Sequence, residues 1–178
     1  VPADLAEKFR YRAGQFLTFL VPHSAGAFNR CYSLSSAPES DGLPKVTVKR
    51  VTGGKGSNWF HDTLKEGVSL EVLPPAGRFV LSEGTAPLLL FGGGSGITPM
   101  MSLIKSALKG GTRRVRLFYA NRDKASIIFD AEFEALMKAN PGRLEVVHHL
   151  DAVQGLTRPE EIVAALKGFE EAEAYLCG

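Results

Sequence analysis

Residues 91–99 read FGGGSGITP, and this stretch decides the fold. The apolar run Pro87–Phe91 leads into the glycines, and a helix-forming segment from Thr98 to Leu108 follows them. An unbroken apolar run is typical of a strand buried on both faces of a parallel sheet. Glycines between such a strand and a helix let a phosphate approach the amides at the helix N-terminus, where Pro99 is also well accommodated. The stretch therefore predicts the phosphate-binding turn of an α/β domain.

This turn differs from the common dinucleotide fingerprint Gly-x-Gly-x-x-Gly. Counting from Gly92 the sixth position is Ile97, and counting from Gly94 it is Pro99. The alternative interpretation is a tight glycine turn that binds no ligand. Four glycines within the five positions 92–96 favour a ligand site.

Downstream of this turn, strand and helix patterns alternate. Further strands are predicted over Val115–Ala120, Leu144–His148 and Ala174–Cys177. Further helices are predicted from an N-cap at Asp130 and over Arg158–Leu166. The alternation indicates a parallel sheet with right-handed crossovers.

Upstream of residue 84 the apolar period is short. Candidate strands, separated by Gly, Pro and Asp turns, are Gln15–Val21, Cys31–Ser35, Lys45–Val51, Val68–Leu73 and Arg78–Leu81. Such closely spaced strands predict an antiparallel barrel or sandwich, interrupted by one helix that Ser57 caps and Gly67 ends. The boundary at residues 82–85 gives two domains, 1–83 and 84–178. We expect further chain at both ends, because the first strand lacks its beginning and the last stops at Gly178.

Composition narrows the class of protein. The 178 residues carry a net charge of +2 without a long run of like charges, which argues against nucleic acid or a membrane surface as partner. The longest apolar stretch, Ala86–Phe91, is too short to span a bilayer. Cys31 and Cys177 cannot supply the four ligands of an iron–sulfur cluster, and they predict a reducing, cytoplasmic location.

Two earlier segments are also candidate cofactor sites. In Arg30-Cys31-Tyr32-Ser33, strand alternation places Arg30 and Tyr32 on one face, suited to a phosphate and a planar ring. Gly54-Lys55-Gly56-Ser57 precedes a helix and offers a second anion site. Taken alone, each also fits ordinary structure: a solvated Arg with a half-buried Tyr, and a capped hairpin turn. No metal site is predicted, because the adjacent His148 and His149 point to opposite faces of a strand.

The motifs Arg30-x-Tyr32-Ser33, Gly54-x-x-Ser57, Gly92–Pro99 and Cys177-Gly178 occur in this order. Together they resemble the ferredoxin–NADP reductase superfamily over essentially the whole chain. That resemblance implies an antiparallel FAD-binding β-barrel followed by an α/β parallel-sheet nucleotide-binding domain. The stretches 119–122, 127–129 and 149–151 are similar to reductase components of bacterial hydroxylases, of the ketosteroid 9α-hydroxylase or phenylacetyl-CoA epoxidase type.

The resemblance implies a role for each motif. Arg30 would pair with the FAD pyrophosphate, and the glycine loop would hold that of NADH or NADPH. Residues implied to lie beside the hydride path are Tyr32, Ser33, Thr98 and Cys177. Residues implied to bind the cofactors are Arg30, Tyr32, Ser33, Gly54, Lys55, Gly56, Ser57, Phe79, Gly92, Gly93, Gly94, Ser95, Gly96, Thr98, Pro99 and Arg122.

The implied activity is hydride transfer from NAD(P)H to FAD, followed by single-electron transfer to a ferredoxin-type iron–sulfur carrier that serves an oxygenase. The 2Fe-2S cluster would lie in a domain or partner outside this chain. Two alternatives stay open: the reductase half of a flavohaemoglobin, and a regulatory module that binds flavin and nucleotide without catalysis. The choice between NADH and NADPH also stays open, because Arg122 would attract a 2′-phosphate and Asp123 would repel it.

Overall fold

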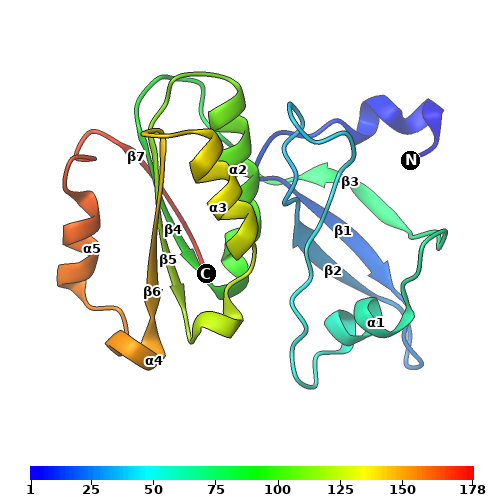
Figure 1. Cartoon of the computed structure of the whole chain (residues 1–178). Coiled ribbons are helices and arrows are strands. Elements are labelled where there is room, and N and C mark those ends of the chain that lie inside the picture. Colours follow the sequence, from blue (N-terminus) through cyan, green and yellow to red (C-terminus); the bar gives the residue numbers. More distant parts are fainter.

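The computed structural model describes the backbone of residues 1–178 and every side chain except that of Ala3. Two domains lie side by side (Figure 1). An antiparallel sheet forms the first domain, and a parallel sheet covered by helices forms the second. The predicted two-domain fold is therefore confirmed.

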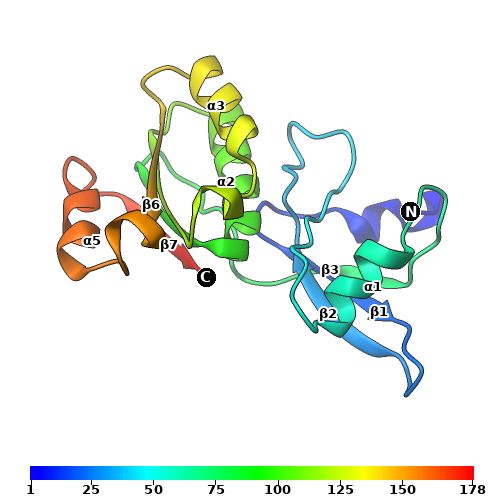
Figure 2. The same cartoon turned by 60° about the horizontal axis from the view of Figure 1, so that its bottom comes forward.

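The first domain contains a sheet of strand order β2-β1-β3, and α1 packs against it (Figure 2). Both pairings are antiparallel, and Phe16 of β1 lies opposite Ser33 of β2. Its elements are η1 (Ala3–Phe9), β1 (Phe16–Val21), β2 (Phe28–Ser33), α1 (Lys55–Thr63) and β3 (Val72–Ala76).

Two predicted strands of this domain have irregular backbone instead. Within 45–51, pairing is limited to an isolated bridge between Leu34 and Val46. Side chains of α1 take the neighbouring backbone groups: His61 bonds the Val48 carbonyl at 2.7 Å, and the Ser57 hydroxyl accepts from the Val51 amide at 3.1 Å. The segment 78–81 leaves the sheet, and the predicted strand at 68–73 is shifted to Val72–Ala76.

The predicted start and end of the first helix are wrong. α1 begins at Lys55, with Gly54 in the N-cap position, and ends at Thr63 rather than at Gly67. Ser57 lies inside the first turn, where its hydroxyl holds the Val51 amide and the Gly54 carbonyl. The serine therefore ties the helix to the preceding loop.

The second domain contains a parallel sheet of order β6-β5-β4-β7, as predicted. Helices α2 and α3 cover the face turned toward the first domain, and α5 covers the other face (Figure 1). Its elements are β4 (Leu88–Gly93), η2 (Gly94–Gly96), α2 (Ile97–Lys109), β5 (Val115–Asn121), η3 (Lys124–Ser126), α3 (Asp130–Ala139), β6 (Leu144–Leu150), α4 (Asp151–Gln154), α5 (Pro159–Leu166) and β7 (Glu173–Cys177).

The N-cap prediction at Asp130 is off by one residue. Phe129 occupies the cap of α3 in a left-handed conformation, with φ of 69°, and Asp130 is the first helical residue. The Phe129 carbonyl accepts from the Phe133 amide at 2.9 Å. The acidic side chain still lies in the first turn, where a negative charge is favourable.

The larger core lies between the parallel sheet and α2. It is a cluster of 15 buried hydrophobic residues, which includes Ala13 from the first domain. The core between β1, β2 and α1 has three buried members: Phe19, Val21 and Phe60. Among the residues that the structure describes, no helix is both long and apolar enough to cross a membrane.

Candidate functional site

A cavity of about 420 Å³ is lined by residues of both domains. It brings together the Arg30–Ser33 strand, the N-terminus of α1, the start of α2 and the end of β7. The lining residues are Arg30, Cys31, Tyr32, Ser33, Thr47, Lys49, Val51, Gly54, Lys55, Gly56, Ser57, Ser95, Gly96, Thr98, Pro99, Cys177 and Gly178.

Side chains form the wall that the first domain contributes. Arg30 and Tyr32 both face α1, as strand alternation predicts, because a Cβ on Gly56 would lie 3.0 Å from Arg30 Cγ and 3.4 Å from Tyr32 Oη. The Tyr32 ring packs edge-on against Phe60, with ring centroids 5.0 Å apart. The exposed Arg30 guanidinium lies over the Phe28 ring at 4.5 Å. This wall offers a cation beside a planar ring.

The N-terminus of α1 adds backbone donors to the same wall. The first amides of a helix lack acceptors within the helix and carry a partial positive charge. Gly54, Lys55, Gly56 and Ser57 all line the cavity at this end. Any side chain on Gly56 would meet Arg30, so this glycine permits close packing of helix and strand.

Backbone atoms form the wall that the second domain contributes. A Cβ on Gly96 would lie 2.2 Å from the Cys177 carbonyl oxygen and 2.7 Å from the Gly178 amide nitrogen. The β7 terminus therefore runs directly against the glycine loop, with no room for a side chain between them. The Thr98 hydroxyl donates to the Ser95 carbonyl at 3.1 Å and holds the loop at the start of α2.

A buried tyrosine fixes the glycine loop from behind. The Tyr119 hydroxyl donates to the Gly94 carbonyl at 3.0 Å and accepts from the Ile128 amide at 3.2 Å. Tyr119 is fully buried, and burial raises the pKa of its phenol, so it remains a donor at neutral pH. The loop geometry is thus supported by the core of the sheet.

The charges of the cavity suit an anion. Among the described residues that line it, Arg30, Lys49 and Lys55 are cationic and none is acidic. Burial raises the pKa of the Tyr32 phenol and of the Cys177 thiol, so both are neutral near pH 7. The cavity therefore combines the neutral side chains of Tyr32 and Cys177 with the cations of the first-domain wall.

Several lining residues were not among the predicted site residues: Thr47, Lys49 and Val51, together with Cys31 and Gly178, which lie in the quoted motifs without a predicted role. The alternation of residues 45–51 places positions 47, 49 and 51 on one side of an extended segment, and this pattern could have identified them as a group. Lys49 reaches toward the other domain, with its Nζ 3.9 Å from where a Cβ on Gly94 would lie.

Five predicted site residues lie outside this lining. Gly92 and Gly93 end β4 and Gly94 begins η2, so all three precede the part of the loop that lines the cavity. Phe79 packs edge-on against Tyr175, with centroids 5.4 Å apart. Arg122 is exposed and pairs with Asp123 at 3.0 Å.

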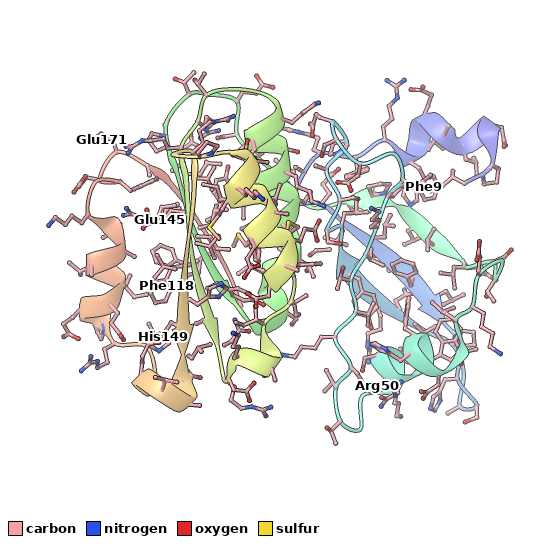
Figure 3. All side chains as sticks on the ribbon, viewed as in Figure 1. Phe9, Arg50, Phe118, Glu145, His149 and Glu171 are labelled. Carbon is pink, nitrogen blue, oxygen red and sulfur yellow. The ribbon has the colours of Figure 1, made fainter. Side chains whose placement is uncertain are left out.

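The adjacent histidines diverge as predicted. His149 stacks on Phe118 on the face of the sheet turned toward α5 (Figure 3). His148 lies near Tyr119 and 3.8 Å from Asp130 at the start of α3. The two rings therefore belong to opposite layers of the domain.

Comparisons with known proteins match both halves of the chain. The family model of the oxidoreductase FAD-binding domain matches residues 3–81, and that of the oxidoreductase NAD-binding domain matches residues 90–178. The 3-ketosteroid-9-alpha-monooxygenase ferredoxin reductase component of Rhodococcus rhodochrous is 51% identical over 179 positions, covering 100% of this chain and 51% of the relative. The chain thus spans about half the length of this curated relative.

Two further proteins extend the comparison. A flavohemoprotein of Burkholderia is 33% identical, with 79% of this chain and 35% of that protein covered. Among solved structures, the Amycolatopsis cytochrome P450 reductase GcoB matches with a TM-score of 0.77 and 27% identity, over 93% of this chain and 52% of that one.

Proposed function

The chain belongs to the oxidoreductases that join an FAD-binding domain to an NAD-binding domain, and from this premise we propose that it is an electron-transfer reductase. In this proposal it takes hydride from NADH or NADPH onto FAD and supplies single electrons to an iron–sulfur carrier that serves an oxygenase. The similarity to a monooxygenase reductase component supports the assignment.

The observation that carries the proposal is the shared cavity, with one helix N-terminus in each wall. Each helix N-terminus suits a phosphate, and two dinucleotides each bring a pyrophosphate. Arg30, Lys55 and the amides of Gly54–Ser57 would hold FAD. The loop ending at Gly96 would hold the nicotinamide cofactor, with Lys49 adding charge from the first domain.

The fit is supported by the close packing that the glycines permit around both helix termini. Side chains at Gly56 and Gly96 would collide with Arg30 and with the end of β7, and would displace these cavity-lining residues. When both cofactors are bound, they supply the hydride chemistry, and the protein orients them. Tyr32 would pack against the flavin ring, while Ser33, Thr98 and Cys177 line the space between the domains.

The neutral state of Cys177 suits this role. An ionised thiolate beside the rings would compete as a nucleophile, whereas burial keeps the thiol protonated. Thr98 is committed to the Ser95 carbonyl, so its side chain is held in one orientation. Close, fixed placement of two reactants is itself a large source of rate acceleration.

Several parts of the assignment rest on this proposal alone: the division at residues 83 and 84, the ferredoxin type of the acceptor and the cytoplasmic location. The reductase half of a flavohaemoglobin is the second candidate, and the similarity to the Burkholderia flavohemoprotein favours it. Both candidates share the same hydride step.

An anaerobic titration of the full-length protein with NADH and with NADPH tests the proposal. Rapid bleaching of the flavin absorption band by one donor is the expected result, and it identifies the donor. Bound flavin that neither donor bleaches would instead favour a module that binds flavin and nucleotide without catalysis. A folded protein without flavin would exclude the FAD site around Arg30.

A further inference from the structure

Helix α2 turns a polar face toward the first domain. Its apolar residues, such as Leu103 and Ile104, enter the core of the second domain. Ser102 and Ser106, one helical turn apart, point the other way and contact residues of the first domain. The same helix begins at the cavity, so it links the domain contact to the cofactor site (Figure 1).

Ser102 is fully buried and uses its hydroxyl twice. It donates to the Ser36 carbonyl at 2.6 Å and accepts from the Gly14 amide at 3.3 Å. Both partners are backbone groups of the first domain. A buried hydroxyl that satisfies two backbone groups leaves both without partners when it is removed.

The two backbone partners flank one end of the β1–β2 ladder. Gly14 lies two residues before β1, and Ser36 lies three residues after β2. Phe16 and Ser33 pair at this same end. Ser102 is therefore joined to both strands next to Ser33, which lines the cavity.

The domains also approach closely at this point. Gly14 has φ of +94°, and a Cβ there would lie 3.2 Å from Leu103 Cδ2 of α2 and 2.2 Å from the Phe79 carbonyl oxygen of its own domain. The Gly14 backbone is therefore enclosed between α2 and the 78–81 segment. A shift of the helix is consequently transmitted to the start of β1.

Thr98 lies one turn before Ser102 on α2, about 6 Å along the helix axis. Residues one turn apart on a helix move together, because continuous backbone hydrogen bonds make the helix rigid over that length. The Ser102 hydroxyl consequently fixes the position of Thr98, on the nicotinamide side, relative to Ser33, on the flavin side.

We propose that Ser102 is a positioning residue that sets the separation between the flavin and nicotinamide half-sites across the domain contact. The inference rests on the proposed function, since it concerns the geometry of the same hydride step. Ser102 touches neither cofactor site itself and acts through α2 and the β1–β2 ladder.

Other contacts along α2 are farther from the cavity. Lys105 lies 2.6 Å from Glu132 of its own domain and 3.5 Å from Asp41 of the first. Ser106 bonds the carboxylate of Glu39, an exposed residue. Because Glu39 is exposed, water can replace the Ser106 hydroxyl at its carboxylate, so the loss of Ser106 is tolerated better than the loss of a partner by two buried backbone groups.

The test compares the full-length protein with Ser102→Ala and the matched control Ser106→Ala. Stopped-flow reduction by the preferred donor separates the donor Kd from the saturating rate per bound flavin. We expect Ser102→Ala to lower that rate by ~10- to 100-fold, as small misplacements do, with donor Kd and flavin content within about twofold. Ser106→Ala should keep the rate within about twofold of wild type.

A saturating rate per bound flavin that Ser102→Ala leaves unchanged would overturn the inference, as would a loss matched entirely by lost flavin. Should Ser102→Ala fail to retain flavin, Ser102→Cys carries the test, because it fills the site with a longer, weaker donor. It should then reduce the rate, and a wild-type rate would overturn the proposal. A wild type that neither donor reduces would refute the proposed function itself.

Discussion

The two walls of the cavity are built differently. The first domain contributes charged and aromatic side chains, such as Arg30, Lys49 and Tyr32, whereas the second contributes backbone that runs against backbone at Gly96 and Cys177. The hydrophobic cores also differ: the cluster of the second domain has 15 buried residues, and that of the first domain has three. A backbone-lined site needs a rigid support, and the larger core supplies it.

The two half-sites should therefore tolerate different changes. An added methyl group should damage the backbone-lined wall more than the loss of a side chain damages the other. Two substitutions test this expectation, and a third tests the contact between the domains.

The largest effect is expected for Gly96→Ala. The new Cβ would meet backbone atoms of Cys177 and Gly178 rather than flexible side-chain ends, so the end of β7 must move. Overpacking of this kind costs about 3 kcal/mol. Because the loop must return to its original position to hold the donor, binding would have to supply this energy, which corresponds to a roughly 100-fold loss of nicotinamide affinity. Titration of the bound flavin with the donor measures the affinity, and flavin content should stay unchanged.

Gly111→Ala is the control, because a Cβ there meets no atom within 4 Å. Its donor affinity should match that of wild type. If Gly96→Ala also binds the donor normally, the wall is more adaptable than the contrast between the domains implies.

An intermediate effect is expected for Arg30→Ala. The substitution removes a cation from the wall and leaves the helix amides in place, so FAD affinity should fall about tenfold, near the lower end for a charged hydrogen bond. Equilibrium dialysis of FAD against the apoprotein measures the change. Arg50→Ala removes the same charge from a position that pairs with Asp62 outside the cavity and should leave FAD affinity unchanged.

The smallest effect is expected for Asp41→Asn, at the contact between the domains. Burial disfavours the Asp41 carboxylate, but the Ala37 amide, Lys45 and Lys105 outweigh it and hold its pKa below the usual value. A lowered pKa means that the stabilisation is complete above the unfolded-state value of about 3.9 and is lost as pH falls through the folded-state pKa.

Asp41→Asn should therefore lower the free energy of unfolding by about 1 kcal/mol at neutral pH. Urea unfolding between about pH 7 and pH 3 measures the difference, which should shrink toward the acid end. A difference that grows on acidification would contradict the assigned direction of the pKa shift.

The strongest sequence signals belonged to the second domain. The unbroken apolar run before Gly92 and the glycines after it placed β4 and α2 within two residues of their bounds, because each position there is consistent with a single structure. The helix caps were harder. Ser57 and Asp130 are good capping residues, yet Gly54 and Phe129 occupy those positions because the loops approach at angles that local preference does not reveal.

The strand predicted at 45–51 failed for a tertiary reason. Side chains of α1 bind its backbone groups, and a sequence pattern does not show which partner a carbonyl will find. Lys49 and Ser102 were missed on similar grounds, since their importance arises only when the two domains meet. The glycine loop and the Arg30–Ser33 segment could be predicted because each depends on local backbone conformation, which the sequence pattern indicates.

The hydroxyl of Ser102 also bears on how the chain is made. Its partners are 88 and 66 residues nearer the N-terminus, so both leave the ribosome well before the serine does. At roughly 5–20 residues per second, the wait for Ser36 is on the order of 3–13 seconds. During synthesis, the Gly14 amide and the Ser36 carbonyl must be satisfied by water or by a chaperone until α2 has emerged. The nascent first domain thus exposes to solvent the surface that α2 covers in the folded protein.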